Sequence, residues 1–204
     1  MQPNMMKAEA GGLKETQIIV LVIKDSEYLN NMLNLTKDIS QVSKRICYVT
    51  LNRPYMSIVE LFLKSNIDLS KFYFVDAITK TAEMVETKDN CEFVSSPGAL
   101  TELSLTISNI LEKEKFDYLI FDSLSTLLVY ESDTVITKFI HFLIAKIRVI
   151  GCNAFFTCLK QDNSSLLIRD INMFADKIID VEKLSMYPTS SSASSQPQFA
   201  FQKS

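Results

Sequence analysis

The sequence predicts an α/β domain built as a three-layer sandwich, in which a mainly parallel sheet lies between two layers of helices. Two observations support this prediction. Short runs rich in β-branched and aromatic residues are continuously apolar, which is typical of strands that are covered on both faces. Between these runs, apolar residues recur at helical spacing, and strands that alternate with helices form βαβ crossovers.

Six segments are predicted to be strands. The first, Ile18 to Ile23, reads IIVLVI and contains no polar residue. The other five lie at 46–51, 72–76, 118–122, 153–157 and 177–181. The stretch 77–99 shows no dominant period and contains Pro97-Gly98, so it is predicted to be a loop. An extra hairpin or a lid in this stretch stays open.

Four helices are predicted between these strands. Apolar residues recur at largely helical spacing from Leu29 to Val42, and Asp25 or Ser26 is expected to cap this helix. Pro54 suits the start of the second helix. The four helical segments are 29–42, 55–66, 100–111 and 135–150. The second and the fourth carry many large apolar residues, which burial against the sheet mostly explains, although part of them would suit a subunit interface.

Length and composition favour one cytoplasmic domain. The 204 residues divide into a flexible leader at 1–14, a domain at 15–184 and a disordered Ser-rich tail at 185–204. A net charge of -3 with dispersed basic residues argues against a nucleic-acid surface. No apolar run is long enough to span a bilayer, so no membrane partner is expected. The four cysteines form no CxxC or Cys/His cluster, and no metal site is predicted.

One segment carries a specific resemblance. Residues 116–128 read FDYLIFDSLSTLL, and they resemble the Walker B strand of RecA-superfamily ATPases of the KaiC type, with the Asp-Ser-Leu-Ser that follows it. Segments 44–51, 66–76 and 175–180 are similar to other strands of that family, so the resemblance covers roughly residues 15–184. It implies a RecA-like sheet. It also implies three chemical features, namely a GxxxxGK[ST] phosphate loop, an acidic residue after the second strand, and a Walker B aspartate that supports Mg²⁺.

Only the third feature is present in this sequence, as Asp122. The four glycines are at 11, 12, 98 and 151, and none lies between the first strand and the helix that opens near Ser26. A phosphate loop needs glycine because its backbone adopts conformations that a Cβ forbids. Asn52 and Arg53 follow the second strand, and neither side chain accepts a proton from water at neutral pH. The sequence therefore predicts a degenerate ATPase with no catalytic residue, no hydrolysis and no expected cofactor.

If ATP and Mg²⁺ do bind, the resemblance implies that Asp122, Ser123 and Arg53 contact them. Otherwise Asp122 is expected to be a structural carboxylate that accepts hydrogen bonds from the backbone N–H groups of Ser123 and Ser125. Arg53 is expected on a solvated turn, or paired with an acidic partner or a phosphate. The only histidine, His141, is expected to be a packed or boundary residue of its helix.

The function expected from the sequence is that of a KaiC-like pseudo-ATPase that regulates or scaffolds a protein partner, which is another protein or a second copy. Two alternatives stay open, a weak nucleotide-binding or sensory domain and an ATPase that a paralogue completes in trans. The two phenylalanines in the tail segment 198–201 are either a docking motif or chance apolar content.

Overall fold

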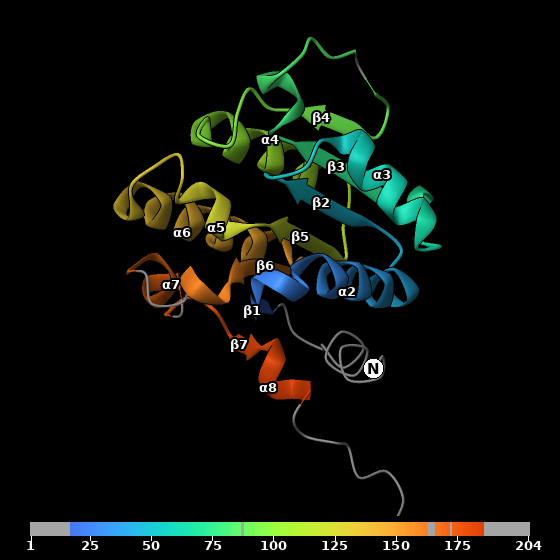
Figure 1. Cartoon of the computed structure of the whole chain (residues 1–204). Coiled ribbons are helices and arrows are strands. Elements are labelled where there is room, and N and C mark those ends of the chain that lie inside the picture. Colours follow the sequence, from blue (N-terminus) through green and yellow to red (C-terminus); the bar gives the residue numbers. More distant parts are fainter. Residues whose placement is uncertain (1–16, 87, 163–165, 172, 186–204) are drawn as a thin grey trace, which may run out of the picture.

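The computed structural model describes residues 17–185, apart from 87, 163–165 and 172 (Figure 1). It confirms the predicted α/β sandwich. Within the described residues, seven strands form one sheet in the order β4-β3-β2-β5-β6-β1-β7, and every neighbouring pair is parallel. The predicted leader at 1–14 and the tail from 186 onward lie outside the described residues.

All six predicted strands are present, and their observed bounds differ from the predicted ones by two residues at most. The seven strands are β1 (Ile18–Ile23), β2 (Ile46–Thr50), β3 (Phe72–Asp76), β4 (Cys91–Phe93), β5 (Tyr118–Asp122), β6 (Asn153–Leu159) and β7 (Lys177–Asp180). The stretch 77–99, which was predicted to be a loop, contains the short strand β4, which pairs with β3. Three residues are too few to show a strand period.

The four predicted helices are also present. Within the described residues, the α-helices are α2 (Tyr28–Val42), α3 (Tyr55–Lys64), α4 (Leu100–Lys113), α5 (Leu124–Leu127), α6 (Asp133–Ile150), α7 (Leu166–Ile171) and α8 (Val181–Ser185). The predicted N-cap of the first helix is wrong. Asp25 and Ser26 belong to a short 3₁₀ helix, η1 (Asp25–Glu27), and no side chain caps α2. None of the described helices is both long and apolar enough to cross a membrane.

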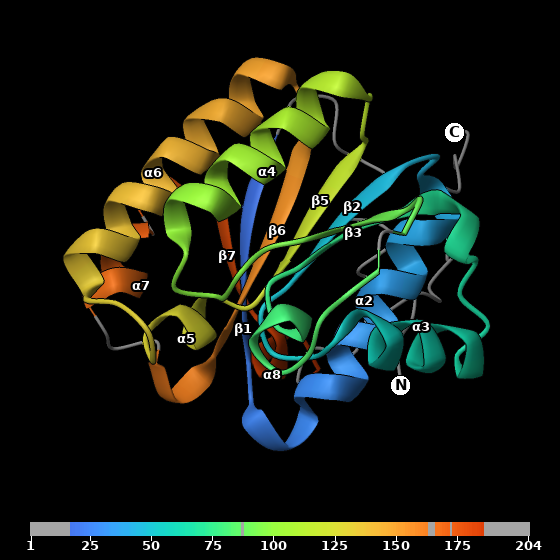
Figure 2. The same cartoon turned by 90° about the horizontal axis from the view of Figure 1, so that it is seen from above.

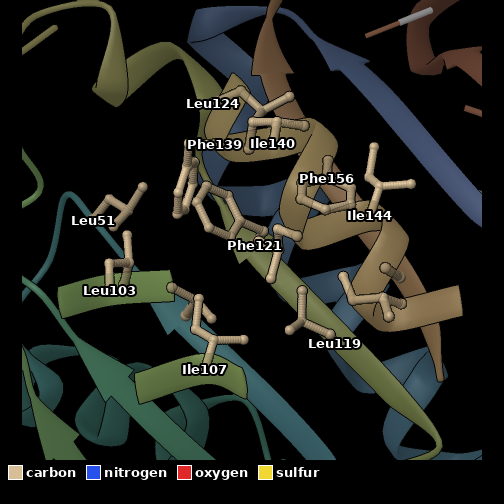
Figure 3. Close-up of a cluster of buried hydrophobic side chains, with 14 of the residues drawn as sticks. Leu51, Leu103, Ile107, Leu119, Phe121, Leu124, Phe139, Ile140, Ile144 and Phe156 are labelled. Carbon is tan, nitrogen blue, oxygen red and sulfur yellow. The ribbon is translucent and has the colours of Figure 1, made fainter. Parts of the chain in front are cut away.

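Two apolar layers lie on the two faces of the sheet (Figure 2). Along β1, Ile18, Val20 and Val22 face α4 and α6, whereas the alternate residues face α2 and α3. Figure 3 shows part of the first layer, where Phe121 of β5 and Phe156 of β6 lie against the apolar face of α6. Because both faces are covered, the strand sequences are continuously apolar rather than alternating.

The topology brings the ends of the strands together. Since all strands run in the same direction, the residues that follow β1, β2, β3, β5 and β6 emerge at one edge of the sheet. β5 lies between β2 and β6, and β6 in turn separates β5 from β1. Ligand sites of open parallel sheets lie at this edge.

Candidate functional site

A buried carboxylate, Asp122, lies at the centre of this edge. Asp122 is the last residue of β5 and is 3% exposed. Its two oxygens accept three hydrogen bonds from side chains. Tyr48 Oη donates at 2.8 Å, Asn52 Nδ2 donates at 3.1 Å, and Tyr28 Oη donates the third. The carboxylate therefore already has donors on both oxygens.

The three donors come from α2, from β2 and from the turn that follows β2. Tyr48 lies on β2 opposite Ile120, and both side chains belong to the layer covered by α2 and α3. Asn52 follows β2 by two residues. Tyr28 is the first residue of α2, and its hydroxyl is also 2.7 Å from Thr157 Oγ1 on β6. The cluster therefore ties the start of α2 to three neighbouring strands.

Burial determines the protonation of this cluster. Desolvation raises the pKa of Asp122, while the hydrogen bonds from Tyr28, Tyr48 and Asn52 and the charge of Arg53 lower it, and burial has the larger effect. Burial also raises the pKa of both tyrosines, and the neighbouring carboxylate raises it further. The two hydroxyls therefore stay protonated and act as donors.

Of the other residues predicted to bind a nucleotide, Ser123 directly follows Asp122 and Arg53 directly follows Asn52. Arg53 is half-buried in a turn in which its carbonyl oxygen accepts a hydrogen bond from Thr50 Oγ1 at 2.7 Å. Its charge lowers the pKa of Asp122, but the two residues form no ion pair within 4 Å. Ser123 is buried, and its hydroxyl is 3.1 Å from Thr126 Oγ1.

The predicted partners of Asp122 are wrong. The backbone N–H groups of Ser123 and Ser125 do not bind its carboxylate, and Ser125 Oγ instead accepts a hydrogen bond from Leu159 N at 2.8 Å. The sequence reasoning missed Tyr28 and Tyr48 as partners of Asp122. Tyr48 stands in an apolar strand, where a tyrosine is not distinguishable from a core aromatic residue until the register is known.

A second buried carboxylate, Asp76, ends β3. It accepts hydrogen bonds from the backbone N–H groups of Tyr55 at 2.7 Å, Ile78 at 2.7 Å and Thr79 at 2.9 Å, and from the Thr79 hydroxyl. It therefore fixes the start of α3 and the turn after β3. Within the part of the chain that the structure describes, no three His, Cys, Asp or Glu side chains are gathered closely enough to hold a metal ion.

The end of β1 is compact. Lys24 alone connects β1 to η1, and its side chain is exposed. Next to β1, Lys160 forms ion pairs with Asp180 at 3.4 Å and with Glu182.

The only histidine, His141, is a boundary residue of α6, as expected, because it is exposed and its ring centroid is 4.4 Å from that of Phe174.

Comparison with known proteins agrees with this fold. The chain is similar to a KaiC-like protein from the hyperthermophilic archaeon Pyrococcus horikoshii, with a TM-score of 0.60 and 13% identity over 81% of this chain and 73% of that one. It is also similar to the flagellar accessory protein FlaH from Methanocaldococcus jannaschii, with a TM-score of 0.54 and 14% identity over 88% of this chain and 77% of that one.

These similarities confirm the expected resemblance to KaiC-type proteins at the level of the fold. No curated protein matches the chain. A family model matches residues 45–181, which include β2 to β7 and the two carboxylates Asp76 and Asp122. The chain therefore belongs to the family of unknown function DUF7504.

Proposed function

We propose that this chain is a non-catalytic, KaiC-like pseudo-ATPase that acts as a regulatory or scaffolding protein-interaction module. The observation that carries the proposal is the closed environment of Asp122. The residue that the Walker B resemblance assigns to Mg²⁺ is buried under two tyrosine hydroxyls and one amide.

The residues around Asp122 do not fit a Mg²⁺ ion. Mg²⁺ requires oxygen ligands in near-octahedral geometry, supplied by carboxylates, phosphates and water. Tyr28, Tyr48 and Asn52 direct protons toward the Asp122 oxygens, and these protons occupy the positions in which a cation would be coordinated. The other nearby charge is that of Arg53, which is positive and repels a cation.

The link after β1 does not fit a triphosphate. A phosphate loop of about eight residues wraps the phosphates with successive backbone N–H groups. Here Lys24 is followed at once by η1, and the link contains no glycine. Asp25 and Glu27 are exposed in η1, and their carboxylates repel phosphate. The position expected for Mg²⁺ at Asp122 and the position expected for the phosphates after β1 are therefore altered by separate changes in the sequence.

What this chain retains is the shape of the domain. A fold does not determine a function, and a sheet with helices on both faces presents strand-end loops and helix surfaces even when its chemistry is lost. The edge around Asp122 is held by side-chain hydrogen bonds. This arrangement supports the proposal that the loops at this edge contact a protein partner.

A thermal-shift titration with ATP and with ADP, each with Mg²⁺, tests the proposal. A ligand present at one hundred times its dissociation constant adds about 2.7 kcal/mol to the stability, which is a shift of several degrees in a domain of this size. We expect no shift for either nucleotide.

The test variant is Arg53→Ala, which removes the charge that acts on Asp122, and the control variant is Lys64→Ala, at an exposed position of α3. A rise in melting temperature that Arg53→Ala removes and Lys64→Ala retains would replace the proposal with the nucleotide-binding alternative.

A further inference from the structure

Four oxygen atoms form a continuous row at the end of β5. Asp122 Oδ1 contacts Tyr28 Oη, Tyr28 Oη is 2.7 Å from Thr157 Oγ1, and Thr157 Oγ1 is 3.2 Å from the backbone oxygen of Phe121. The row starts on β5, crosses to the first residue of α2, continues to β6 and returns to β5. Tyr28 is half-buried and the other three residues are buried, so these atoms depend mainly on one another for hydrogen bonds.

Each of the three contacts in this row needs one hydrogen atom. Tyr28 and Thr157 have one hydroxyl proton each, and the backbone oxygen of Phe121 is an acceptor. With Asp122 ionised, the row therefore holds two protons for three contacts. Thr157 then donates either to Tyr28 or to Phe121, and one contact is left without a hydrogen bond. With Asp122 protonated, the row holds three protons, and all three contacts are hydrogen bonds.

The neighbouring donors favour Oδ1 as the atom that carries the proton of Asp122. Tyr48 Oη donates to Oδ2 at 2.8 Å, which is its one hydrogen bond to the described residues, and a proton on Oδ2 would turn this donor away. Tyr28, at Oδ1, has a second acceptor in Thr157 and can pass its own proton on. Asn52 Nδ2 donates to Oδ1 at 3.1 Å, and a protonated carboxyl oxygen still accepts this hydrogen bond.

We propose that Asp122, Tyr28 and Thr157 form a proton-dependent latch, in which three hydrogen bonds run in one direction along the row. The protonated carboxyl of Asp122 donates to Tyr28, Tyr28 donates to Thr157, and Thr157 donates to the backbone oxygen of Phe121. When Asp122 releases its proton to the solvent, Tyr28 turns its own proton to the carboxylate. One proton leaves the protein, one negative charge stays on Asp122, and one of the three hydrogen bonds is lost.

The groups that act on Asp122 come from the elements on both sides of β5. α2 presents Tyr28 and β2 presents Tyr48, and burial raises the pKa of both hydroxyls, so they keep their protons while the carboxyl titrates. Arg53, in the turn after β2, supplies a positive charge that lowers the pKa of Asp122, although burial raises this pKa by more. β6 presents Thr157, which has no charge. Its hydroxyl therefore acts on the titration of Asp122 through hydrogen bonds.

The latch determines how firmly the start of α2 is held to the sheet. Tyr28 is the first residue of α2, and no side chain caps this helix. The residues before it, 24–27, are exposed. Protonation of Asp122 fastens α2 to β5 and β6, and loss of the proton loosens the start of α2 and the link after β1. This inference goes beyond the proposed function, because the latch responds to a proton whether or not a partner binds at this edge.

An NMR titration of the full chain measures the proton directly. The shift of the Asp122 carboxyl carbon, assigned by the loss of its signal in Asp122→Asn, gives the midpoint of the titration. We expect this midpoint to lie above the ordinary value of 3.8, and the amide signals of residues 25–28 to shift with the same midpoint. A midpoint at or below 3.8 would overturn the latch, and so would amide signals that do not follow the carboxyl.

Thr157→Val separates the latch from the effect of burial alone. Valine has nearly the same shape and lacks the hydroxyl, so the protonated row loses two hydrogen bonds and the ionised row loses one. We expect the acid dissociation constant of Asp122 to rise by about 3- to 10-fold, which is the effect of one net hydrogen bond. If burial alone set the midpoint, the more apolar valine would leave this constant unchanged or lower it. Either of these results in a folded variant would overturn the latch.

Three further variants complete the test. Thr157→Ser keeps the hydroxyl and should restore the wild-type constant, and Thr101→Val, the same change as Thr157→Val at an exposed position of α4, should not alter it. Tyr48→Phe should lower the constant, because its hydrogen bond is stronger to the ionised carboxylate than to the neutral carboxyl. Circular dichroism melting shows whether each variant is folded. If Thr157→Val does not fold, the wild-type titration decides, since its midpoint and the amide shifts do not depend on that variant.

Discussion

At the residue scale, Asp122 stabilises the domain through the hydrogen bonds that it accepts. Replacing it with alanine leaves the hydroxyls of Tyr28 and Tyr48 and the amide of Asn52 without their acceptor. Tyr48 is buried and Tyr28 is half-buried, and a buried donor that loses its partner costs about 1–3 kcal/mol, whereas the Asn52 amide is exposed and binds water instead. We expect Asp122→Ala to lower the free energy of unfolding by about 3 kcal/mol in urea titrations. Tyr48→Phe, which removes one donor and keeps the ring, should lower it by about 1–2 kcal/mol. Equal losses in the two variants would contradict the shared role of the carboxylate.

The raised pKa of Asp122 predicts that the free energy of unfolding depends on pH. Burial raises the pKa of Asp122 above its ordinary value of 3.8, so the folded state holds this proton more tightly than the unfolded state does. The corresponding stability is fully present below the ordinary pKa and is lost as the pH rises through the raised pKa. Asp122→Asn cannot ionise. In urea titrations at increasing pH, we expect the wild type to lose stability relative to Asp122→Asn above the ordinary pKa and then to reach a plateau. A wild type that gains relative stability in this range would show that the hydrogen bonds outweigh burial.

The sequence locates Asp122 but not its surroundings. The aspartate follows four apolar residues and precedes Ser-Leu-Ser, which is a local pattern. Its donors are 70 to 94 residues away in the chain. Tyr48 reaches the carboxylate only because β2 and β5 pair with Thr50 opposite Asp122. Strand register is a property of the folded sheet, so no local pattern predicts these contacts.

At the scale of elements, burial on both faces makes the strands easy to predict. Four of the strands, β1, β2, β3 and β5, present four or more apolar residues in a row, whereas β6 and β7 have three and two, and β4 has only three residues and lies at the edge of the sheet. The short helices α5, α7 and α8 have four to six residues, fewer than two full turns, and so show no period. The sequence thus predicts the longer elements, including the edge strand β7, and misses the shortest ones, β4, α5, α7 and α8.

Phe62 is the most deeply buried of the three side chains, with Tyr55 and Ile58, through which α3 packs against the sheet. Phe62 is fully buried, with ring centroids 5.3 Å from Tyr48, 5.1 Å from Phe72 and 6.0 Å from Phe74. Phe62→Ala would leave a cavity among these rings, and we expect it to lower the free energy of unfolding by about 3–5 kcal/mol. Leu63→Ala, at the next position but exposed, should change it by less than about 0.5 kcal/mol. Denaturant titrations measure both. Similar effects of the two variants would mean that α3 is not anchored through Phe62.

At the scale of the whole molecule, the fold and the chemistry of this chain are separable. The architecture is similar to that of a KaiC-like protein and of the flagellar accessory protein FlaH at 13% and 14% identity, because an alternating pattern of buried strands and amphipathic helices specifies it. The edge around Asp122 depends on a few polar side chains, and here tyrosine hydroxyls and an amide surround the carboxylate. The core can therefore keep its shape while the edge changes its role.

The labelling of the four cysteines measures how strongly each part of the sheet resists opening. They lie on β2, β4 and β6 and just before β6, and all are buried. Burial raises the pKa of the Cys152 and Cys158 thiols to about 12, and it also raises the pKa of Cys47 and Cys91. Thiol reagents attack the thiolate, so at mildly alkaline pH we expect the native protein to resist labelling and the unfolded protein to react at all four positions.

The order of labelling should follow the topology. β4 pairs only with β3, so Cys91 is exposed by opening one three-residue edge strand, whereas Cys47 in β2 has a strand on each side. Local opening at a sheet edge costs less free energy than global unfolding. Mass spectrometry at low denaturant should therefore find Cys91 labelled first, and Cys91→Ala should leave the other three to react together at the global unfolding rate. Labelling of Cys47 as fast as that of Cys91 would show that the sheet opens at its centre, which two closed apolar layers do not permit.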